Sequence, residues 1–377
     1  MEASTVANTV SNTAARTFGV EEEFLLVDPA TGRTAPGAAE VLRIAGGHPP
    51  AAADAALHTE LLTTQVEAAT GRCRSLDELG DQLTHARRQL ADAARAAGLW
   101  LVPSGTAVLG GDTEISVTTT HERFAGIADR FAEVVREYQA CGCHVHVGVP
   151  DLETAVAVVN HLRPWLPTLL ALSANSPFHQ GRDTGYASWR MIEQARFPGA
   201  GVPPWFDSAG DYTAQVGRLV EQGVLLDEAM TFWLVRPSAH LPTVEFRAAD
   251  TAVDVPGALL QAALSRALVV TALAELDRGR TAFPVDTQTA AAALWSAARH
   301  GLAGPGVHPV LAKRVPATEL LGDLLAWVTP ALEAAGDLVA VRELVAGVLR
   351  DGTGAERQRA VTPADPFQIV RYLAGDR

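Results

Sequence analysis

The chain has 377 residues, and its 48% hydrophobic and 19% charged content is that of a globular protein with a substantial core, not of a disordered chain. A formal net charge of −13, with no run of Lys or Arg, argues against nucleic-acid binding and against binding to an anionic membrane surface. No segment reads as a bilayer-spanning run, and residues 1–15 lack the features of a signal peptide.

We expect residues 1–15 to form a mobile tail, and the length of the chain is compatible with one large domain or two closely packed ones. Three cysteines, an odd number in a chain of this length, do not make a disulfide framework, which favours a reducing cytoplasm.

The first predicted element is a strand over residues 17–27 with an unusual polar face. By strand alternation, Glu21 and Glu23 share one face, while Val20, Glu22 and Phe24 share the other. Carboxylates in an otherwise apolar strand cost stability unless they are exposed, paired or bound to a cation. A solvated edge strand is the alternative interpretation.

Residues 58–67 carry two further carboxylates, and their pattern fits either a strand or the start of a helix. Glu60 and Glu67 would share one face of a helix, but would lie on opposite faces of a flat strand without a bulge. Three better-defined elements follow: a helix over 75–98 with Ser75 as its N-cap, a buried strand over 99–102, and a helix over 121–140.

Residues 141–150 (CGCHVHVGVP) predict a strand that separates two kinds of side chain. His144 and His146 lie on one face, and Cys143, Val145 and Val147 lie on the other, so the valine face is expected to be core. A Cys₂His₂ zinc site is an alternative, but its ligand pairs are normally separated by a turn, and here alternation sends Cys143 away from both histidines. We therefore expect the cysteines to be structural.

The second half begins with helices over 151–164 and 165–173, followed by an irregular loop rich in glycine, aromatic and polar residues over 174–190. Such loops often bind ligands, and Arg190 and Arg196 favour an anion. A hairpin is predicted around residues 237–240; in its second strand Glu245 and Arg247 share one face. Residues 256–350 are expected to be mainly helical with a break at Pro330, and 352–359 to form a turn with two arginines.

Three predicted strands thus place charged side chains opposite their apolar residues. If these strands belong to one antiparallel sheet, the charged faces converge on an acidic concavity. Clustered carboxylates repel one another unless divalent cations neutralise them, and oxygen ligands with one imidazole suit Mg²⁺, with Mn²⁺ as an alternative. No phosphate-binding glycine loop is present, so a nucleotide would be held through metal ions and arginines.

Long motifs across nearly the whole chain resemble the glutamate-cysteine ligase type 2, or carboxylate-amine ligase, family of the glutamine synthetase-like superfamily. They are FGVEEEF at 18–24, ELL with QVE over 60–67, CGCHVHVGVPD at 141–151, SANSPF at 173–178, GRDTGYASWR at 181–190, RPSAHLPTVEFR at 236–247 and GTGAERQR at 352–359. The resemblance implies an α+β fold in which a curved, mainly antiparallel sheet forms the active-site wall and helices pack on its outer face. Residues 16–377 would then be a single catalytic ligase domain.

The resemblance also implies which residues form the site. The metal ligands would be Glu21, Glu23, Glu60, Glu67, Glu245 and a histidine, either His144 or His146, of which we favour His146. Arg247 and Glu245 would act at the reacting groups. Carboxylate or phosphate would be bound by Arg182, Arg190, Arg196, Arg357 and Arg359.

The implied activity is ATP-dependent amide formation between a small carboxylic acid and an amine, through an acyl phosphate, with ADP and phosphate as co-products. A γ-glutamyl amide is suggested by the family name, but residues 191–198 and 246–250 depart from the family pattern and leave both substrates open. The alternatives are a guanidino-type phosphotransferase on a related fold and a non-catalytic binding member of the family. A homodimer is the default for such an enzyme.

Overall fold

A single antiparallel sheet organises the computed structural model, which describes residues 17–111, 117–118, 122–361 and 365–376. The expected tail over residues 1–15 lies outside this range. The strand order is β2-β3-β1-β5-β9-β8, with β4 also paired to β1. The strands are β1 Phe18–Val27, β2 Ala56–Thr59, β3 Gln65–Ala69, β4 Trp100–Val102, β5 Gly142–Gly148, β8 Val235–Pro237 and β9 Thr243–Asp250. Because β1 lies between β3 and β5, the alternative of a solvated edge strand is wrong.

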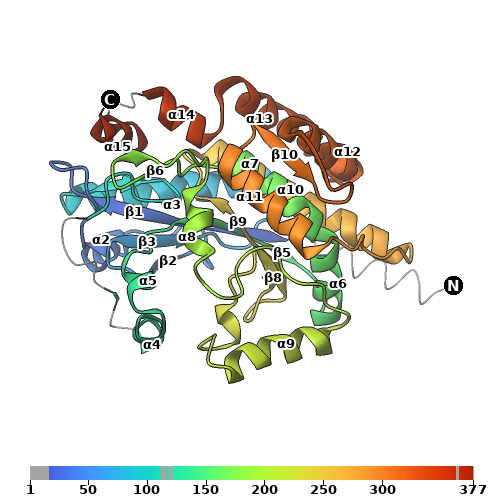
Figure 1. The fold of residues 1–377 in the computed structure, drawn as a ribbon. Coiled ribbons are helices and arrows are strands. Elements are labelled where there is room, and N and C mark those ends of the chain that lie inside the picture. The colour runs from blue at the N-terminus through green and yellow to red at the C-terminus, as the bar shows by residue number, and fades with distance from the viewer. Residues whose placement is uncertain (1–16, 112–116, 119–121, 362–364, 377) are drawn as a thin grey trace.

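One face of this sheet packs against helices and forms the main core. Val20, Cys143, Val145 and Val147 belong to the same buried cluster as α6 Leu152–Leu162, α7 Leu166–Ser173 and α10 Val255–Asp277. The alternation predicted for residues 141–150 is therefore confirmed. Figure 1 shows α7, α10, α11, α12 and α13 gathered on one side of the molecule, with α4 and α9 on the opposite side.

The helix α10 is long and apolar enough, by length and composition, to cross a membrane, which corrects the expectation that no such run exists. Of the 18-residue window that meets this test, 72% is buried inside the protein. A helix that is apolar on all sides is typical of the core of a large protein, so burial in the core explains the composition of α10.

The C-terminal region is mainly helical, as expected. It contains α11 Thr287–His300, the hairpin β10 Pro305–His308 with β11 Lys313–Pro316, α12 Ala317–Ala335 and α13 Leu338–Asp351. The predicted break at Pro330 is wrong, because α12 continues through this residue. The helix ends instead at Gly336, whose φ of 78° is the left-handed conformation that favours glycine.

Three other expectations change. The pattern over residues 58–67, left open between strand and helix, belongs to two strands, β2 and β3, with Glu60 in the connection. The single helix predicted over 121–140 is divided at Ala132, where φ is 47°, into α4 Glu122–Phe131 and α5 Glu133–Arg136. The turn predicted over 352–359 is largely the helix α14 Gly354–Val361.

The remaining elements are short or peripheral. The helix predicted from Ser75 is α3 Leu76–Ala96, whose N-cap is Ser75. The others are α2 Ala38–Ala45, β6 Phe178–His179, β7 Arg182–Asp183, α8 Trp189–Gln194, α9 Ala209–Glu221, α15 Pro366–Ala374 and the 3₁₀ turns η1 Arg163–Trp165 and η2 Glu228–Met230.

Candidate active site

Cross-strand pairing places the charged residues in a row on the face of the sheet opposite the main core. Glu67 of β3 lies directly opposite Glu23 of β1, and Glu21 lies opposite His144 of β5. The row continues through His146, whose partner is Glu245 of β9, and ends at Arg236 of β8, the partner of Glu245. Directly opposed residues have neighbouring Cβ atoms, so the register itself brings these side chains together. They line a cavity of about 580 Å³.

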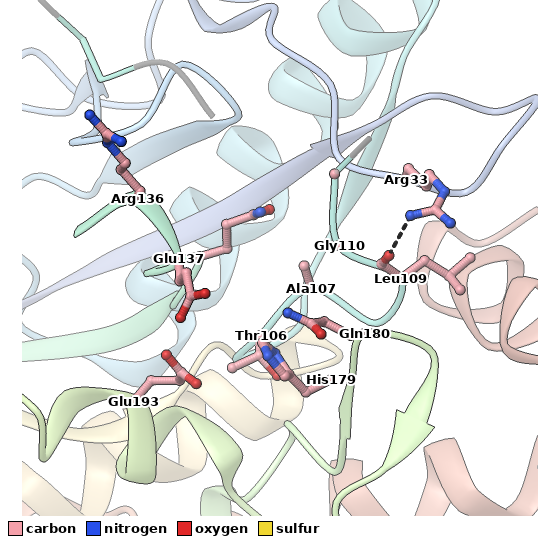
Figure 2. Close-up of a pocket in the computed structure, with 12 residues that line it drawn as sticks. Arg33, Thr106, Ala107, Leu109, Gly110, Arg136, Glu137, His179, Gln180 and Glu193 are labelled. Atoms are coloured by element: carbon pink, nitrogen blue, oxygen red, sulfur yellow. Dashed lines mark hydrogen bonds between the residues drawn. The ribbon is translucent and has the colours of Figure 1, made fainter. Parts of the chain in front are cut away.

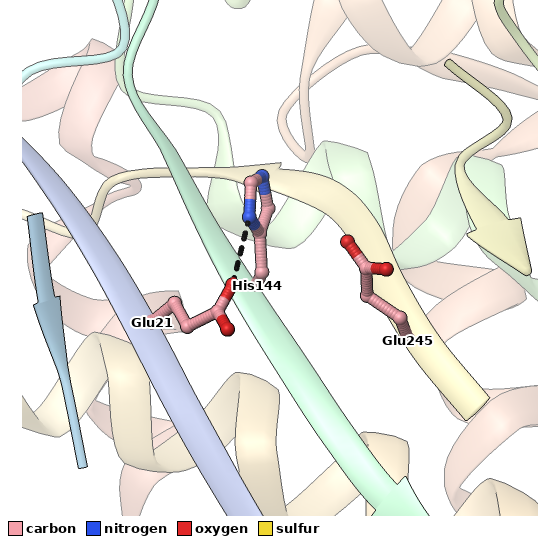
Figure 3. Close-up of side chains that lie close together, drawn as sticks. All are labelled: Glu21, His144 and Glu245. Atoms are coloured by element: carbon pink, nitrogen blue, oxygen red, sulfur yellow. Dashed lines mark ion pairs between the residues drawn. The ribbon is translucent and has the colours of Figure 1, made fainter. Parts of the chain in front are cut away.

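The first potential metal-binding group consists of Glu21, His144 and Glu245 (Figure 3). One ligand atom from each residue lies within 4.8 Å of the other two. The Nδ1 atom of His144 is 3.5 Å from a carboxylate oxygen of Glu21. His146 is outside this group, although its Nε2 atom is 3.3 Å from Glu21. The geometry thus favours His144 as the ligand and does not support the preference for His146.

The second group consists of Glu23, Glu60 and Glu67, which come from β1, the β2–β3 connection and β3. Their ligand atoms also lie within 4.8 Å of one another. Glu60 shares this site with Glu67 because the chain reverses between β2 and β3, a geometry that neither a continuous helix nor a flat strand would give. Three carboxylates at this separation form a hard oxygen site of the kind that Mg²⁺ and Mn²⁺ prefer.

Burial and mutual repulsion raise the pKa values of this second group. For Glu23, burial and the nearby charge of Glu60 raise the pKa to about 8. Burial likewise raises the pKa of Glu60, and burial with the charges of Glu21 and Glu60 raises that of Glu67 well above its usual range. A cation that neutralises these carboxylates would remove the cost of ionising them together.

In the first group, the pKa values of the two carboxylates are lowered instead of raised, because histidines and arginines surround them. Burial acts to raise the pKa of Glu21, but hydrogen bonds with His144 and His146 outweigh it and lower the pKa. For Glu245, the charges of Arg236 and Arg247 outweigh burial and hold the pKa well below its usual range. Burial, together with the charge of Arg247, lowers the pKa of His144 to about 4. A neutral imidazole is the form that coordinates a metal ion.

One histidine nitrogen has unused hydrogen-bonding capacity. The Nε2 atom of His144 is buried without a hydrogen-bond partner and lies 3.7 Å from a carboxylate oxygen of Glu23. His146 instead contacts Glu21 through Nε2, and its Nδ1 atom is 2.9 Å from the hydroxyl of Thr243. A buried polar atom without a partner destabilises the fold unless a ligand binds it. The donor set and the free Nε2 atom of His144 therefore fit divalent cations.

Four arginines line the same cavity: Arg123, Arg190, Arg236 and Arg247. Arg123 is paired with Asp227. Arg247 donates to Glu245 at 2.5 Å, and Arg236 binds both oxygens of Glu245, at 2.8 and 3.1 Å. Arg190 is 2% exposed, its Nη1 atom lies 3.7 Å from Asp250, and its Nε and Nη1 atoms have no hydrogen-bond partner. These guanidinium groups can bind anionic groups of substrates beside the carboxylates.

The other predicted anion-binding arginines lie away from this cavity. Arg182 is exposed on β7, Arg357 pairs with Asp254, and Arg359 pairs with Asp183. Arg196 bridges Glu137 and Glu193. Among the predicted arginines, the cavity brings together Arg190 and Arg247.

A neighbouring cavity of about 330 Å³ shares a wall with the first (Figure 2). Tyr138 and Ala140 line the larger cavity, while Glu137 and Gln139 line the smaller one. In Figure 2, Glu137 and Glu193 lie on facing sides of this smaller space. The two potential metal-binding groups in the described part of the chain both belong to the larger cavity.

The cysteines take no part in the site. Cys143 lies in the core and Cys141 is buried beside Gln65, 3.1 Å from its Nε2 atom. Burial raises the pKa of both thiols well above the usual range. Since Cys143 points away from both histidines, the described residues form no Cys₂His₂ zinc site.

Sequence reasoning missed Arg236 and Tyr138 among the residues of the site. Tyr138 was assigned to a helix, but the chain leaves α5 at Arg136. Arg236 was assigned to the region of the turn, although it pairs with Glu245. The sequence carried no local signal for Arg236, because only the pairing of β8 with β9 places it opposite Glu245.

Comparison with known proteins agrees with this geometry. The family model of glutamate-cysteine ligase family 2 matches residues 17–366. The chain belongs to this family. It is an ATP-dependent carboxylate-amine ligase of the glutamate-cysteine ligase type.

Two relatives illustrate the sequence similarity. A protein of Saccharopolyspora erythraea, provisionally named glutamate–cysteine ligase 2-2, is 57% identical over 359 residues, which are 95% of this ligase and 91% of the relative. A Salinispora arenicola protein with a similar provisional name is 45% identical over 365 residues, covering 96% and 95% of the two chains.

Solved structures support the fold. The glutamate–cysteine ligase of Francisella tularensis, solved in complex with AMP, has a TM-score of 0.70 at 13% identity, covering 95% of this ligase and 88% of that chain. A bifunctional glutathione synthetase from Pasteurella multocida also has a TM-score of 0.70, at 17% identity, covering 98% and 53%. The expected glutamine synthetase-like α+β fold is confirmed.

Proposed function

We propose that this ligase joins a small carboxylic acid, with glutamate as the first candidate, to a small amine through an acyl phosphate. Mg²⁺, or Mn²⁺ in its place, would be held by the two groups on the sheet. The observation that carries the proposal is the row of cross-strand partners, which gathers four carboxylates, two imidazoles and Arg236 on one face of the sheet. Glu60, Arg190 and Arg247 line the same cavity.

The ligands for the cations are argued from the donor atoms. Glu21, His144 and Glu245 would hold one ion, and Glu23, Glu60 and Glu67 a second. Bound there, the ions would neutralise phosphate oxygens and the charge that develops during phosphoryl transfer.

The arginines would position the reacting anions. Arg190 has a buried guanidinium whose Nε and Nη1 atoms lack a hydrogen-bond partner, which suits a substrate carboxylate or a phosphate. Arg247 and Arg236 hold Glu245 in place. Because Arg247 is largely buried, its positive charge is screened less by water and acts more strongly on anionic groups in the site. In this role the protein orients the reactants and stabilises charge.

The reaction would take two steps, phosphorylation of the acid and then displacement of phosphate by the amine. An oxygen of the substrate carboxylate attacks the γ-phosphorus of ATP, the bond to the β,γ-bridging oxygen breaks, and ADP leaves with that electron pair. The amine nitrogen then attacks the acyl carbon, the bond to the phosphate oxygen breaks, and the nitrogen loses a proton. The products are an amide, ADP and phosphate.

A hydroxylamine-trapping experiment tests this proposal. The protein is incubated with ATP, Mg²⁺, hydroxylamine and one acid at a time, and both ADP and acyl hydroxamate are measured. We expect equal amounts of both with at least one acid, and a loss of at least about 10²-fold for Glu245→Gln, since an interaction with the transferring group is removed. Formation of neither product with any acid contradicts the proposal.

The same assay separates the alternatives. A guanidino-type phosphotransferase would release ADP but yield a stable phosphorylated product and no hydroxamate. A binding protein would yield neither ADP nor hydroxamate.

A cytoplasmic location is also proposed, on the basis of the free thiols of Cys73, Cys141 and Cys143. The homodimer stays a prediction.

A further inference from the structure

A cavity of about 790 Å³ lies within the helical layer, away from the row of charged residues on the sheet. Its walls come from the α6–η1–α7 segment, the C-terminal end of α10 and the residues after it, the end of β10 with the β10–β11 turn, and α12. The helices α6, α7 and α10 belong to the main core, which covers the opposite face of the sheet from Glu21 and His144. The volume is that of a typical small-molecule site.

Aromatic rings form one wall of this cavity. The indole rings of Trp165 and Trp327 are stacked, with centroids 5.0 Å apart and planes at 19°. Phe283, also in the lining, is 69% exposed. An exposed phenyl ring beside two half-buried indole rings favours an apolar or ring-bearing ligand, because binding would remove aromatic surface from water.

A buried polar atom points to what that ligand carries. His161 is 8% exposed, and its Nε2 atom is buried without a hydrogen-bond partner. Burial lowers the pKa of His161 and outweighs a backbone hydrogen bond with Arg280 that acts to raise it. A neutral ring with Nε2 unprotonated would accept a hydrogen bond from a ligand N–H.

The charges in the lining favour a cation. The carboxylate of Asp323 is 51% exposed, and its ion-pair partner is His308 at 3.9 Å. Arg280 is held by Glu275, with 2.9 Å between Nη1 and Oε2. The available carboxylate, the acceptor nitrogen of His161 and the electron-rich indole faces all attract a positively charged N–H group.

We propose that this cavity is a second binding site, separate from the active site, for an organic ammonium ion with an aromatic or other apolar body. The body would lie against Trp165 and Trp327, and the ammonium would bind Asp323 and Nε2 of His161. This inference does not depend on the proposed reaction, because binding is measured without turnover.

Calorimetric titration of the full chain with 2-phenylethylammonium tests the proposal, and 2-phenylethanol and 3-phenylpropionate serve as neutral and anionic analogues. We expect one saturable site outside the active site, at least fivefold weaker binding of both analogues, and about fivefold weaker binding of the amine by Asp323→Asn. Trp327→Leu should weaken binding about tenfold by removing an indole face.

Two controls make the result specific. Glu333→Gln changes an exposed carboxylate elsewhere on α12 and should leave binding unchanged. Glu245→Gln should also leave it unchanged, which excludes binding of the probe as a substrate amine. The proposal is overturned if the amine does not bind, if Asp323→Asn and Glu333→Gln bind it equally, or if sedimentation shows a second copy of the chain covering this cavity.

Discussion

Glu23 shows how strongly the site depends on neighbouring charges. It lies opposite Glu67 in the sheet, and its carboxylate also accepts a hydrogen bond from the backbone of Gly142 at 2.5 Å. Its pKa is nevertheless raised to about 8, because burial and Glu60 outweigh this bond. A group whose pKa is raised on folding binds protons better in the folded state, so its ionisation opposes folding.

A pH prediction follows for the metal-free protein. The stabilising effect of protonated Glu23 is complete below the unfolded pKa of about 4.5 and is lost as pH rises toward about 8. In chelator, Glu23→Gln should therefore be more stable than the parent at pH 8 and close to it at pH 4.5. Thermal melts at both pH values measure this difference. A Glu23→Gln protein that is less stable at pH 8 would contradict it, and excess Mg²⁺ should reverse the order.

At the residue scale, alternation predicted which face each histidine takes, but not which histidine joins the carboxylates. That choice depends on the register: Glu21 is paired with His144, while Gly19 is paired with His146. Arg236 was missed for the same reason, since only the β8–β9 register places it opposite Glu245. Register is a long-range property that one strand's own pattern does not contain.

At the element scale, α3 and β1 are joined by a buried ion pair. Arg87 of α3 binds both oxygens of Glu22, at 2.6 and 2.9 Å, and donates to the carbonyl of Ala252 at 2.8 Å. Glu22 is 1% exposed. This ion pair holds β1, whose other face carries Glu21 and Glu23, against α3.

We expect Arg87→Met to lower the free energy of unfolding by about 3 kcal/mol or more, because it leaves a buried carboxylate unpaired. Chemical denaturation measures the change. Arg88→Met, an exposed neighbour on the same helix, is the matched control and should change stability by less than about 0.5 kcal/mol. Adding Glu22→Gln to Arg87→Met should recover part of the loss. Equal stability of the two single variants would show that the pair does not support β1.

Elements with strong local signals were predicted well, and those decided by context were not. The helix α3 and its N-cap Ser75 were predicted correctly because capping and periodicity are local. Pro330 was read as a break, yet α12 packs Val328, Ala331 and Leu332 into the core on both sides of it. Burial of these residues offsets the local cost of proline.

At the scale of the whole molecule, the six-stranded path of the sheet brings together segments from residue 21 to residue 247. Composition and periodicity predicted helices and strands, and the resemblance to a family predicted a mainly antiparallel sheet, but neither predicted this strand order. The order matters for function because it is what makes β1, β5 and β9 neighbours.

Ligand binding should stabilise the whole fold only when both nucleotide and metal are present. With Mg²⁺ and a nucleotide at about 100 times the dissociation constant, the free energy of unfolding should rise by about 2.7 kcal/mol. Chelator should remove most of this increase, since the carboxylates alone repel phosphate. Thermal melts with nucleotide, with and without Mg²⁺, test this. Equal stabilisation by nucleotide in chelator would contradict the assignment of the carboxylates as metal ligands.

The central claim is that the acid is activated by phosphorylation on this sheet face, and oxygen-isotope transfer tests it most directly. The active acid is labelled with ¹⁸O in its carboxylate and incubated with ATP, Mg²⁺ and amine, and the released phosphate is analysed by mass spectrometry. The account predicts one ¹⁸O atom in each phosphate released with amide. Amide formation with unlabelled phosphate, or a stable phosphorylated product without amide, would contradict it.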